Sequence, residues 1–348
     1  MKTRAAILHT IGEPLEIVEL EIPPLQEGQV LVQMAYSGIC HSQLNEVRGL
    51  KGKDPFLPHT LGHEGSGIVV EVGKNVTKVR PGVPVVLSWL KGAGLDVPRC
   101  AYGWKGSTVN SGAISTFMNY AVISENRVIP LPSGMPLREA ALLGCAIPTG
   151  AGVVRNEMQL KEGSSFALFG AGGVGLSALL AAKFAKAYPL IVVDVQEKKL
   201  KQAKELGATH VFHAKDAASE KILELTNGQG VDFAFESAGK KEAMENAFRS
   251  VKVSSGLCVL AGNLPQGEKI AIDPFDLIRG KRLIGTWGGK SHIDADVAYY
   301  SNLYLQQQFN FSSLISKEIS LNEINCFPEE FDSGHCIRIL VALQPKGP

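Results

Sequence analysis

Three side chains of this 348-residue chain could together hold a metal ion: Cys40, His63 and Cys145. Two thiolates and one imidazole suit Zn²⁺ and leave its fourth coordination position open for water or substrate, as a catalytic site requires. The three residues lie far apart in the sequence, so nothing local forces them together. Their spacing alone therefore also allows the alternative of two buried structural cysteines and a core histidine.

A glycine-rich segment could hold the phosphates of a dinucleotide. It follows a short apolar run, Phe166–Phe169, and precedes an expected helix from Val174 to Ala187. Such a site needs one glycine for a tight turn, one where the backbone approaches the pyrophosphate, and one where the helix packs on its strand. The free N–H groups at the helix N-terminus then bind the phosphates. The segment matches G-x-G-x-x-G and contains Gly170, Gly172, Gly173, Val174 and Gly175.

The acidic residue that such a site needs is Asp194, at the end of the expected strand Leu190–Val195. A carboxylate at this position can accept hydrogen bonds from the ribose hydroxyls of NAD, and it would repel the additional phosphate of NADP. The sequence therefore predicts NAD over NADP. The alternative is a flexible turn followed by a solvated aspartate. That alternative does not explain why a strand is expected before the turn and a helix after it.

The amino-acid composition and net charge indicate a globular protein. Hydrophobic residues make up 45% of the chain, charged residues 20%, and the formal net charge is +1. This balance is ordinary for a globular protein and shows no basic stripe for nucleic acid and no membrane-binding patch. The scattered six cysteines and the short N-terminal apolar run predict neither a disulfide framework nor a signal peptide, so we expect a cytoplasmic protein.

The elements that must position these residues change in character near residue 150. Earlier residues favour short strands separated by Pro and Gly, such as Val30–Met34 and Gly67–Gly73. Later residues alternate short apolar strands with helices, such as the expected helix Glu197–Leu206 ended by Gly207. That alternation predicts βαβ units and a parallel sheet. Further strands are expected at 231–235, 256–261 and 282–287.

Taken together, these motifs resemble the medium-chain, zinc-containing alcohol dehydrogenases over nearly the whole chain. The order is Gly38-x-Cys40-His41-Ser42, Gly62-His63-Glu64-Gly65, Ala141-Leu142-Leu143-Gly144-Cys145 and then the glycine-rich segment. The stretch from Leu143 to Val153 especially resembles the class III, glutathione-dependent formaldehyde dehydrogenase branch. The resemblance implies an α/β protein with a GroES-like, β-rich catalytic domain (1–146 and 290–348) and a Rossmann, doubly wound cofactor domain (147–289). Substrate is then expected in the cleft between the domains.

The resemblance also implies roles for single residues. Zinc, one ion per chain, would act as a Lewis acid at Cys40, His63 and Cys145, with Glu64 behind it as an occasional fourth ligand. Ser42 would accept the proton of the alcohol. The residues expected at NAD, besides the glycine segment and Asp194, are His41, Thr149, Lys199 and Arg338. The residues expected in the substrate pocket are Trp89, Phe117 and Asn263, and ordinary core packing is the alternative for the two aromatics.

The chain departs from the family pattern at three places. The region from about Leu87 to Gly112 contains only Cys100, where many relatives carry four cysteines that bind a structural zinc, and one thiol cannot complete such a site. Gln43 stands where relatives have Asp, which supports the zinc ligands. A neutral amide would leave the metal site more positive and could weaken ligand orientation. Asn45 stands where some relatives complete the proton relay with histidine.

The expected function is hydride transfer between an alcohol and NAD. A polyol or a sugar hydroxyl is slightly favoured as substrate, because polar Asn263 and Gln43 are expected near the site. Two alternatives stay open: a zinc-free NAD(P)H reductase of the same superfamily, and a nonenzymatic NAD-binding protein. The apolar run Arg282–Trp287 is expected to be an edge strand that pairs in a homodimer, or within a tetramer, because an uncovered edge invites association.

Overall fold

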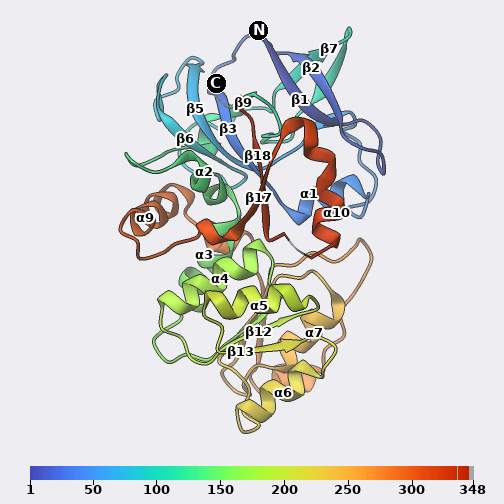
Figure 1. Cartoon of the computed structure of the whole chain (residues 1–348), viewed down its shortest axis with the longest axis vertical. Coiled ribbons are helices and arrows are strands. Elements are labelled where there is room, and N and C mark those ends of the chain that lie inside the picture. Colours follow the sequence, from blue (N-terminus) through green and yellow to red (C-terminus); the bar gives the residue numbers. More distant parts are fainter. Residues whose placement is uncertain (335, 345–348) are drawn as a thin grey trace. The chain divides into compact units, whose positions relative to one another are not determined.

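The structure, a computed structural model, describes residues 1–334 and 336–344. The chain forms two compact units, the first from Met1–Cys145 with His292–Pro348 and the second from Ala146–Ser291 (Figure 1). Among the described residues no single helix has the length and hydropathy to span a membrane. The consecutive helices Leu137–Gly144 and Ala146–Met158 reach them only when taken together.

The first unit is built mainly from β-structure. Strands β1, β2, β7, β8 and β4 form a closed barrel, and a seven-stranded sheet has the order β10-β6-β5-β3-β18-β17, with β9 also paired to β3. The strand bounds are β1 Lys2–Leu8, β2 Glu16–Glu21, β3 Gln29–Ile39, β4 His59–Thr60, β5 Glu64–Val72, β6 Pro84–Ser88, β7 Ala101–Trp104, β8 Ser107–Asn110, β9 Tyr120–Ser124, β10 Val128–Pro130, β17 Ile315–Ser320 and β18 Arg338–Ala342.

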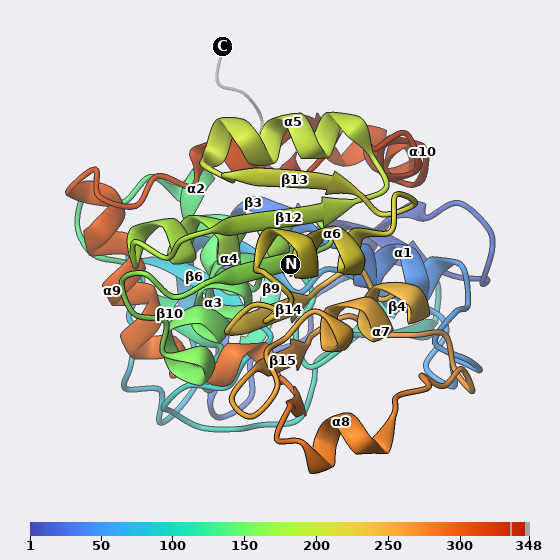
Figure 2. The ribbon, with the colours of Figure 1, turned by 90° about the horizontal axis from the view of Figure 1, so that it is seen from below.

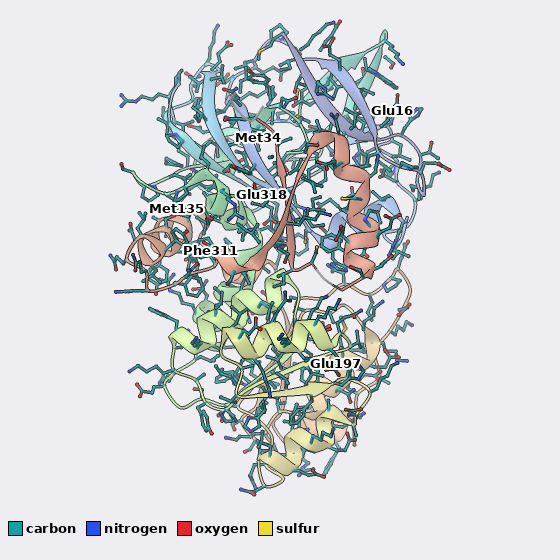
Figure 3. All side chains as sticks on the ribbon, viewed as in Figure 1. Glu16, Met34, Met135, Glu197, Phe311 and Glu318 are labelled. Atoms are coloured by element: carbon teal, nitrogen blue, oxygen red, sulfur yellow. The ribbon has the colours of Figure 1, made fainter. Side chains whose placement is uncertain are left out.

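Strands from opposite ends of the chain lie side by side in that sheet. β18 runs antiparallel to β3, with Ile339 opposite Ile39, and Figure 1 shows the red and blue segments together. Their inward side chains join one core, in which Met34 and Phe117 are completely buried (Met34 is labelled in Figure 3). The helices of this unit are α1 His41–Val47, α2 Leu137–Ala140, α9 Ile293–Leu305 and α10 Phe327–Asp332.

The second unit is a six-stranded parallel sheet in the order β13-β12-β11-β14-β15-β16 (Figure 2). This is the Rossmann order, which reverses beside β11. β11 is buried at all four residues, as expected of a strand covered on both faces. The strands are β11 Phe166–Phe169, β12 Leu190–Asp194, β13 His210–His213, β14 Phe233–Glu236, β15 Leu257–Leu260 and β16 Arg282–Gly285; the helices are α3 Ala146–Gly152, α4 Gly173–Phe184, α5 Glu197–Leu206, α6 Ala218–Leu225, α7 Lys241–Arg249 and α8 Pro274–Ile278.

The expected elements of this unit are confirmed with small shifts in their bounds. α5 has the predicted bounds because Gly207, with φ 118°, ends it in the left-handed conformation. α4 ends at Phe184, earlier than predicted, and Lys186 follows with a positive φ of 56°. β14 begins later than predicted, because Val231 makes only an isolated bridge to Val251 before the ladder starts.

Candidate functional site

The three predicted metal ligands come together in the first unit. One ligand atom from each of Cys40, His63 and Cys145 lies within 4.8 Å of the others, and in the part of the chain that the structure describes this is the only such group that contains cysteine. Cys40 directly precedes α1, His63 directly precedes β5, and Cys145 follows the turn Ala141–Gly144. Three separate backbone segments therefore present two sulfurs and one nitrogen to a common point.

Glycines near these ligands make room for Glu64, which is completely buried. A Cβ on Gly38 would lie 2.2 Å from Glu64 Oε1, and a Cβ on Gly144 would lie 2.9 Å from the Glu64 Cα. A Cβ on Gly38 would displace the Glu64 carboxylate, and one on Gly144 would push against the backbone, because real Cβ atoms do not approach so closely. The glycines of the motifs around Cys40 and Cys145 thus allow both ligand segments to close around one carboxylate.

A buried cation lies on the other side of Glu64. Arg338 on β18 is 2% exposed, its Nε is 3.5 Å from Glu64 Oε1, and its Nη1 donates a 3.0 Å hydrogen bond to the Ile39 carbonyl. Burial would lower the pKa of Arg338, but the nearby Glu64 and the two thiols raise it, so the guanidinium stays charged. The structure brings Arg338 to the metal ligands; its predicted role at the pyrophosphate stays a prediction.

The two cysteines share charge in a way that suits metal binding. The pKa of Cys40 lies well below the ordinary thiol value, because its sulfur accepts a hydrogen bond from Cys145 and lies near Arg338 and His63. The pKa of Cys145 is raised well above that value, first by the hydrogen bond to Cys40 and then by burial. A divalent cation would favour the thiolate form of both sulfurs. The donor set therefore fits zinc.

Gln43 and Ser42 of α1 both reach the histidine of the cluster. The Gln43 side chain contacts His63 Nδ1 through its amide nitrogen, and its Oε1 accepts a 2.9 Å hydrogen bond from the Cys40 N–H. Ser42 Oγ lies 3.4 Å from the same ring nitrogen. Because Nδ1 is engaged, Nε2 is the ring nitrogen left for a metal. Gln43 therefore contacts the backbone of one expected ligand and the ring of another.

When His63 binds a metal, two N–H groups would need the single side-chain oxygen of Gln43 as acceptor. A neutral imidazole that binds a metal through Nε2 carries its hydrogen on Nδ1, so Gln43 would have to present oxygen there. That oxygen already accepts from the Cys40 N–H, and a glutamine has only one. Gln43 is 2% exposed, so water does not resolve the conflict easily. The same burial corrects the expectation that Gln43 contributes polarity to a substrate site.

A buried carboxylate fixes the backbone near Leu95, in the region from about Leu87 to Gly112. Glu125, 1% exposed, accepts hydrogen bonds from the backbone N–H groups of Thr77, Lys78 and Leu95 at 2.7 to 2.8 Å. Burial alone would raise the pKa of Glu125, but these three donors outweigh it and lower the pKa. Cys100 is buried in the apolar core, which raises its pKa to about 11. We did not predict Glu125, because nothing local marks it as different from a surface glutamate.

The predicted dinucleotide loop has the geometry that its glycines require. Gly170 has φ 100°, and a Cβ there would lie 2.7 Å from the Ala238 nitrogen. A Cβ on Gly175 would lie 2.0 Å from the Gly170 carbonyl oxygen, whereas one on Gly172 would meet no atom within 4 Å. The first two glycines therefore allow tight packing, and Gly172 leaves space for a ligand at the start of α4, where the helix begins with Gly173 and Val174.

Asp194 lies at the end of β12 and is joined to this loop. Its Oδ2 accepts a 2.7 Å hydrogen bond from the Ala171 N–H, and its Oδ1 accepts a 2.9 Å bond from the Gln196 N–H. The carboxylate is thus fixed beside the glycine turn. Lys199 lies half-buried on α5, close to Asp194 along the chain.

The other predicted residues are placed as follows. Thr149 is buried in α3, and its hydroxyl has no hydrogen-bond partner among the described residues. His41 is exposed, with its ring 4.6 Å from that of Phe331. Trp89 is half-buried against the core of the first unit, and Asn263 is exposed after β15 of the second. Phe117 exposes no surface, which favours a core residue over a pocket wall.

Comparison with known proteins gives consistent results over nearly the whole chain. Residues 26–133 match the model described as an alcohol dehydrogenase GroES-like domain, and residues 173–302 match that of a zinc-binding dehydrogenase. An S-(hydroxymethyl)glutathione dehydrogenase of Synechocystis sp. is 31% identical, with 98% of this chain and 100% of that protein covered.

Two solved structures agree with the fold. Both are 32% identical, covering 99% of this chain and 100% of their own. One is an alcohol dehydrogenase zinc-binding domain protein from Burkholderia ambifaria with a TM-score of 0.91, and the other is benzyl alcohol dehydrogenase from Acinetobacter calcoaceticus with a TM-score of 0.89.

Proposed function

Because this chain belongs to the zinc-containing alcohol dehydrogenases of the medium-chain type, we propose that it oxidises an alcohol with NAD⁺ and reduces the matching carbonyl with NADH. The observation that carries the proposal is the approach of Cys40, His63 and Cys145 within 4.8 Å. Cys40, His63 and Cys145 would hold the zinc, which when bound acts as a Lewis acid that makes an alcohol hydroxyl more acidic. Bound NAD⁺ supplies the hydride acceptor.

The residues around the cluster bind, orient and move a proton. Ser42, half-buried and 3.4 Å from His63 Nδ1, is the hydroxyl that would take the proton of the alcohol. Gln43 holds the imidazole and the Cys40 backbone. Arg338 and Glu64 supply a buried ion pair beside the thiolates, and Glu64 is proposed as an occasional fourth ligand. No histidine stands at Asn45, so the relay beyond Ser42 ends on water or another group.

The cofactor preference follows from Asp194. Its two oxygens are fixed by the Ala171 and Gln196 N–H groups, so a negative charge stays beside the glycine loop where the adenosine ribose is expected. Lys199, Thr149, His41 and Arg338 are proposed as further contacts of NAD. The catalytic domain is proposed to contain residues 1–146 and 290–348, and the cofactor domain residues 147–289.

The substrate is proposed to be an alcohol, and its class is tested with defined probes. Benzyl alcohol and S-(hydroxymethyl)glutathione are the first probes, because relatives at 32% and 31% identity bear those names. The polyol or sugar preference loses one of its two reasons, since Gln43 is occupied behind the cluster. Trp89 and Asn263 remain proposed pocket residues.

The test is NADH formation by zinc-loaded protein across aromatic, aliphatic, polyol and glutathione-linked alcohols. Turnover with at least one class, lost on removal of zinc, supports the proposal. Purified protein that binds no zinc favours a zinc-free reductase, and zinc-loaded protein without turnover of any alcohol or carbonyl favours a nonenzymatic NAD-binding protein.

A homodimer is proposed through the edge of the second unit. Among the residues that the structure describes, β16 pairs only with β15, and Trp287 and Ile278 near it are 80% and 78% exposed. An open edge beside large apolar side chains is suited to pairing with a second copy. Light scattering of the full chain should give a dimer or tetramer, and a monomer would contradict this. A cytoplasmic location is proposed as well.

A further inference from the structure

A second group of potential ligands lies in the first unit, apart from the cysteine cluster. One atom from each of Glu46, Asp54 and His59 lies within 4.8 Å of the others. Glu46 is on α1, Asp54 is in the segment that follows α1, and His59 begins β4. His59 Nε2 is 2.7 Å from Asp54 Oδ2 and 3.8 Å from Glu46 Oε1. Two carboxylates and one imidazole thus face the same point.

Each of these side chains uses its other polar atom, the one that does not face that point, to contact a neighbouring group. His59 Nδ1 is 3.0 Å from the Thr60 carbonyl, which can only accept, so Nδ1 carries the hydrogen. Asp54 Oδ1 accepts from the Phe56 N–H at 2.9 Å, and Glu46 Oε2 pairs with Lys51 at 3.0 Å. The inward atoms are consequently Nε2, Oδ2 and Oε1. Metal-binding histidines are oriented in this way, by a hydrogen bond from their other ring nitrogen.

The point between these atoms favours a positive charge. With Nδ1–H donating, Nε2 of a neutral His59 presents a lone pair, and a carboxylate oxygen at 2.7 Å would repel it. Either a proton on Nε2 or a metal ion removes that repulsion. Lys51 is half-exposed and balances only one of the two carboxylates. His59 is 6% exposed, so little water reaches the nitrogen.

We propose that Glu46, Asp54 and His59 form a second, non-catalytic site for a divalent transition-metal ion. Its one nitrogen and two oxygen donors are harder than two thiolates, which favours Mn²⁺ or loosely bound Zn²⁺ over the tightly held zinc of the cysteine cluster. A bound ion would join α1 to β4 and so tie down the intervening segment. This site differs from the four-cysteine structural site of relatives, whose region holds only Cys100 in this chain.

The test uses full-length protein whose cysteine cluster is already filled with zinc, titrated with MnCl₂ and followed by the loss of the free Mn²⁺ electron paramagnetic resonance signal. We expect one Mn²⁺ per chain, with spin-echo modulation from a single imidazole nitrogen. Asp54→Asn and His59→Gln should each weaken binding at least about tenfold, since each removes one ligand. The matched control Asp96→Asn removes an exposed carboxylate paired with Lys91 and should leave binding unchanged.

A fourth variant should move in the opposite direction, so that a folding defect cannot imitate the result. Lys51→Gln removes a competing positive charge from Glu46 and should tighten Mn²⁺ binding about threefold, a modest factor because the lysine is half-exposed. Absence of stoichiometric Mn²⁺ binding, or binding that His59→Gln and Asp54→Asn leave intact, would overturn the proposal and make the group a protonated histidine ion pair. Alcohol oxidation by the zinc-loaded enzyme is measured in parallel, and its failure would bear only on the proposed function.

Discussion

Replacement of Gln43 by glutamate tests how this chain orients its metal ligands. The Gln43 amide faces two groups, the Cys40 N–H and His63 Nδ1, and it has one oxygen for both. A carboxylate has two acceptor oxygens, so Gln43→Glu can accept from both groups when His63 binds metal through Nε2. The added charge-assisted hydrogen bond contributes about 1.5–3 kcal/mol, and burial of the new charge offsets part of it. We expect zinc to bind about tenfold more tightly, which corresponds to about 1.4 kcal/mol.

The assay is equilibrium competition for zinc between the metal-free protein and a chromophoric chelator. Asn45→Asp is the matched control, because it adds the same charge to the same helix at a residue that is not among the hydrogen-bond partners of His63. Its effect should stay below about threefold. Gln43→Leu should weaken binding about tenfold, since both groups lose their partner. The reasoning is refuted when Gln43→Glu binds zinc no more tightly than the natural chain, or when Asn45→Asp equals it.

Three further results are expected. Glu125→Gln should destabilise the first unit by about 2 kcal/mol, or lower its melting temperature by about 4–8 °C, and Glu19→Gln, which removes an exposed carboxylate, should not. The folded pKa of Glu125 lies below its ordinary value of 4.5, so its contribution to stability is present at neutral pH and is lost as pH falls through the folded pKa. The melting temperatures of Glu125→Gln and the natural chain should therefore converge in acid. A difference in melting temperature that stays constant with pH would contradict this. Asp194→Ser should lower the ratio of kcat/KM for NAD⁺ over NADP⁺ at least about tenfold, and an unchanged ratio would count against its ribose role. Ser42→Ala should retain zinc but lower kcat about a hundredfold near pH 7, whereas an unaltered kcat would remove it from the proton path.

The second unit could be predicted well because its signals are local. The apolar run at β11, the glycine pattern that follows it and Gly207 at the end of α5 each act within a few residues. The alternation of strands and helices then predicts a parallel sheet, while the order of its strands comes from the structure. The predicted end of α4 failed beside the left-handed residue Lys186, and the predicted start of β14 failed at the isolated bridge of Val231.

The first unit could be predicted in kind but not in detail. Its β-rich character followed from composition, whereas the pairing of β18 with β3 joins opposite ends of the chain and has no local signal. For the same reason, the motifs suggested Cys40, His63 and Cys145, but only the fold brings them within 4.8 Å.

The supporting residues were the hardest to predict. Glu125 differs from a surface glutamate only through three backbone donors, which come from two other segments of the chain. The residue type of Gln43 indicated a neutral group near the ligands, but only the structure shows that its amide contacts both the Cys40 backbone and His63. Contacts of this kind depend on tertiary structure and cannot be inferred from residue type.

The central claim is tested most directly by zinc content measured by mass spectrometry on Cys145→Ser and Cys100→Ser, with alcohol-dependent NADH formation recorded on the same samples. Cys145 belongs to the proposed ligand set, whereas Cys100 lies in the apolar core. We predict that the natural chain and Cys100→Ser each retain one tightly bound zinc and full turnover, and that Cys145→Ser loses both. Tight zinc and undiminished turnover in Cys145→Ser would contradict the assignment.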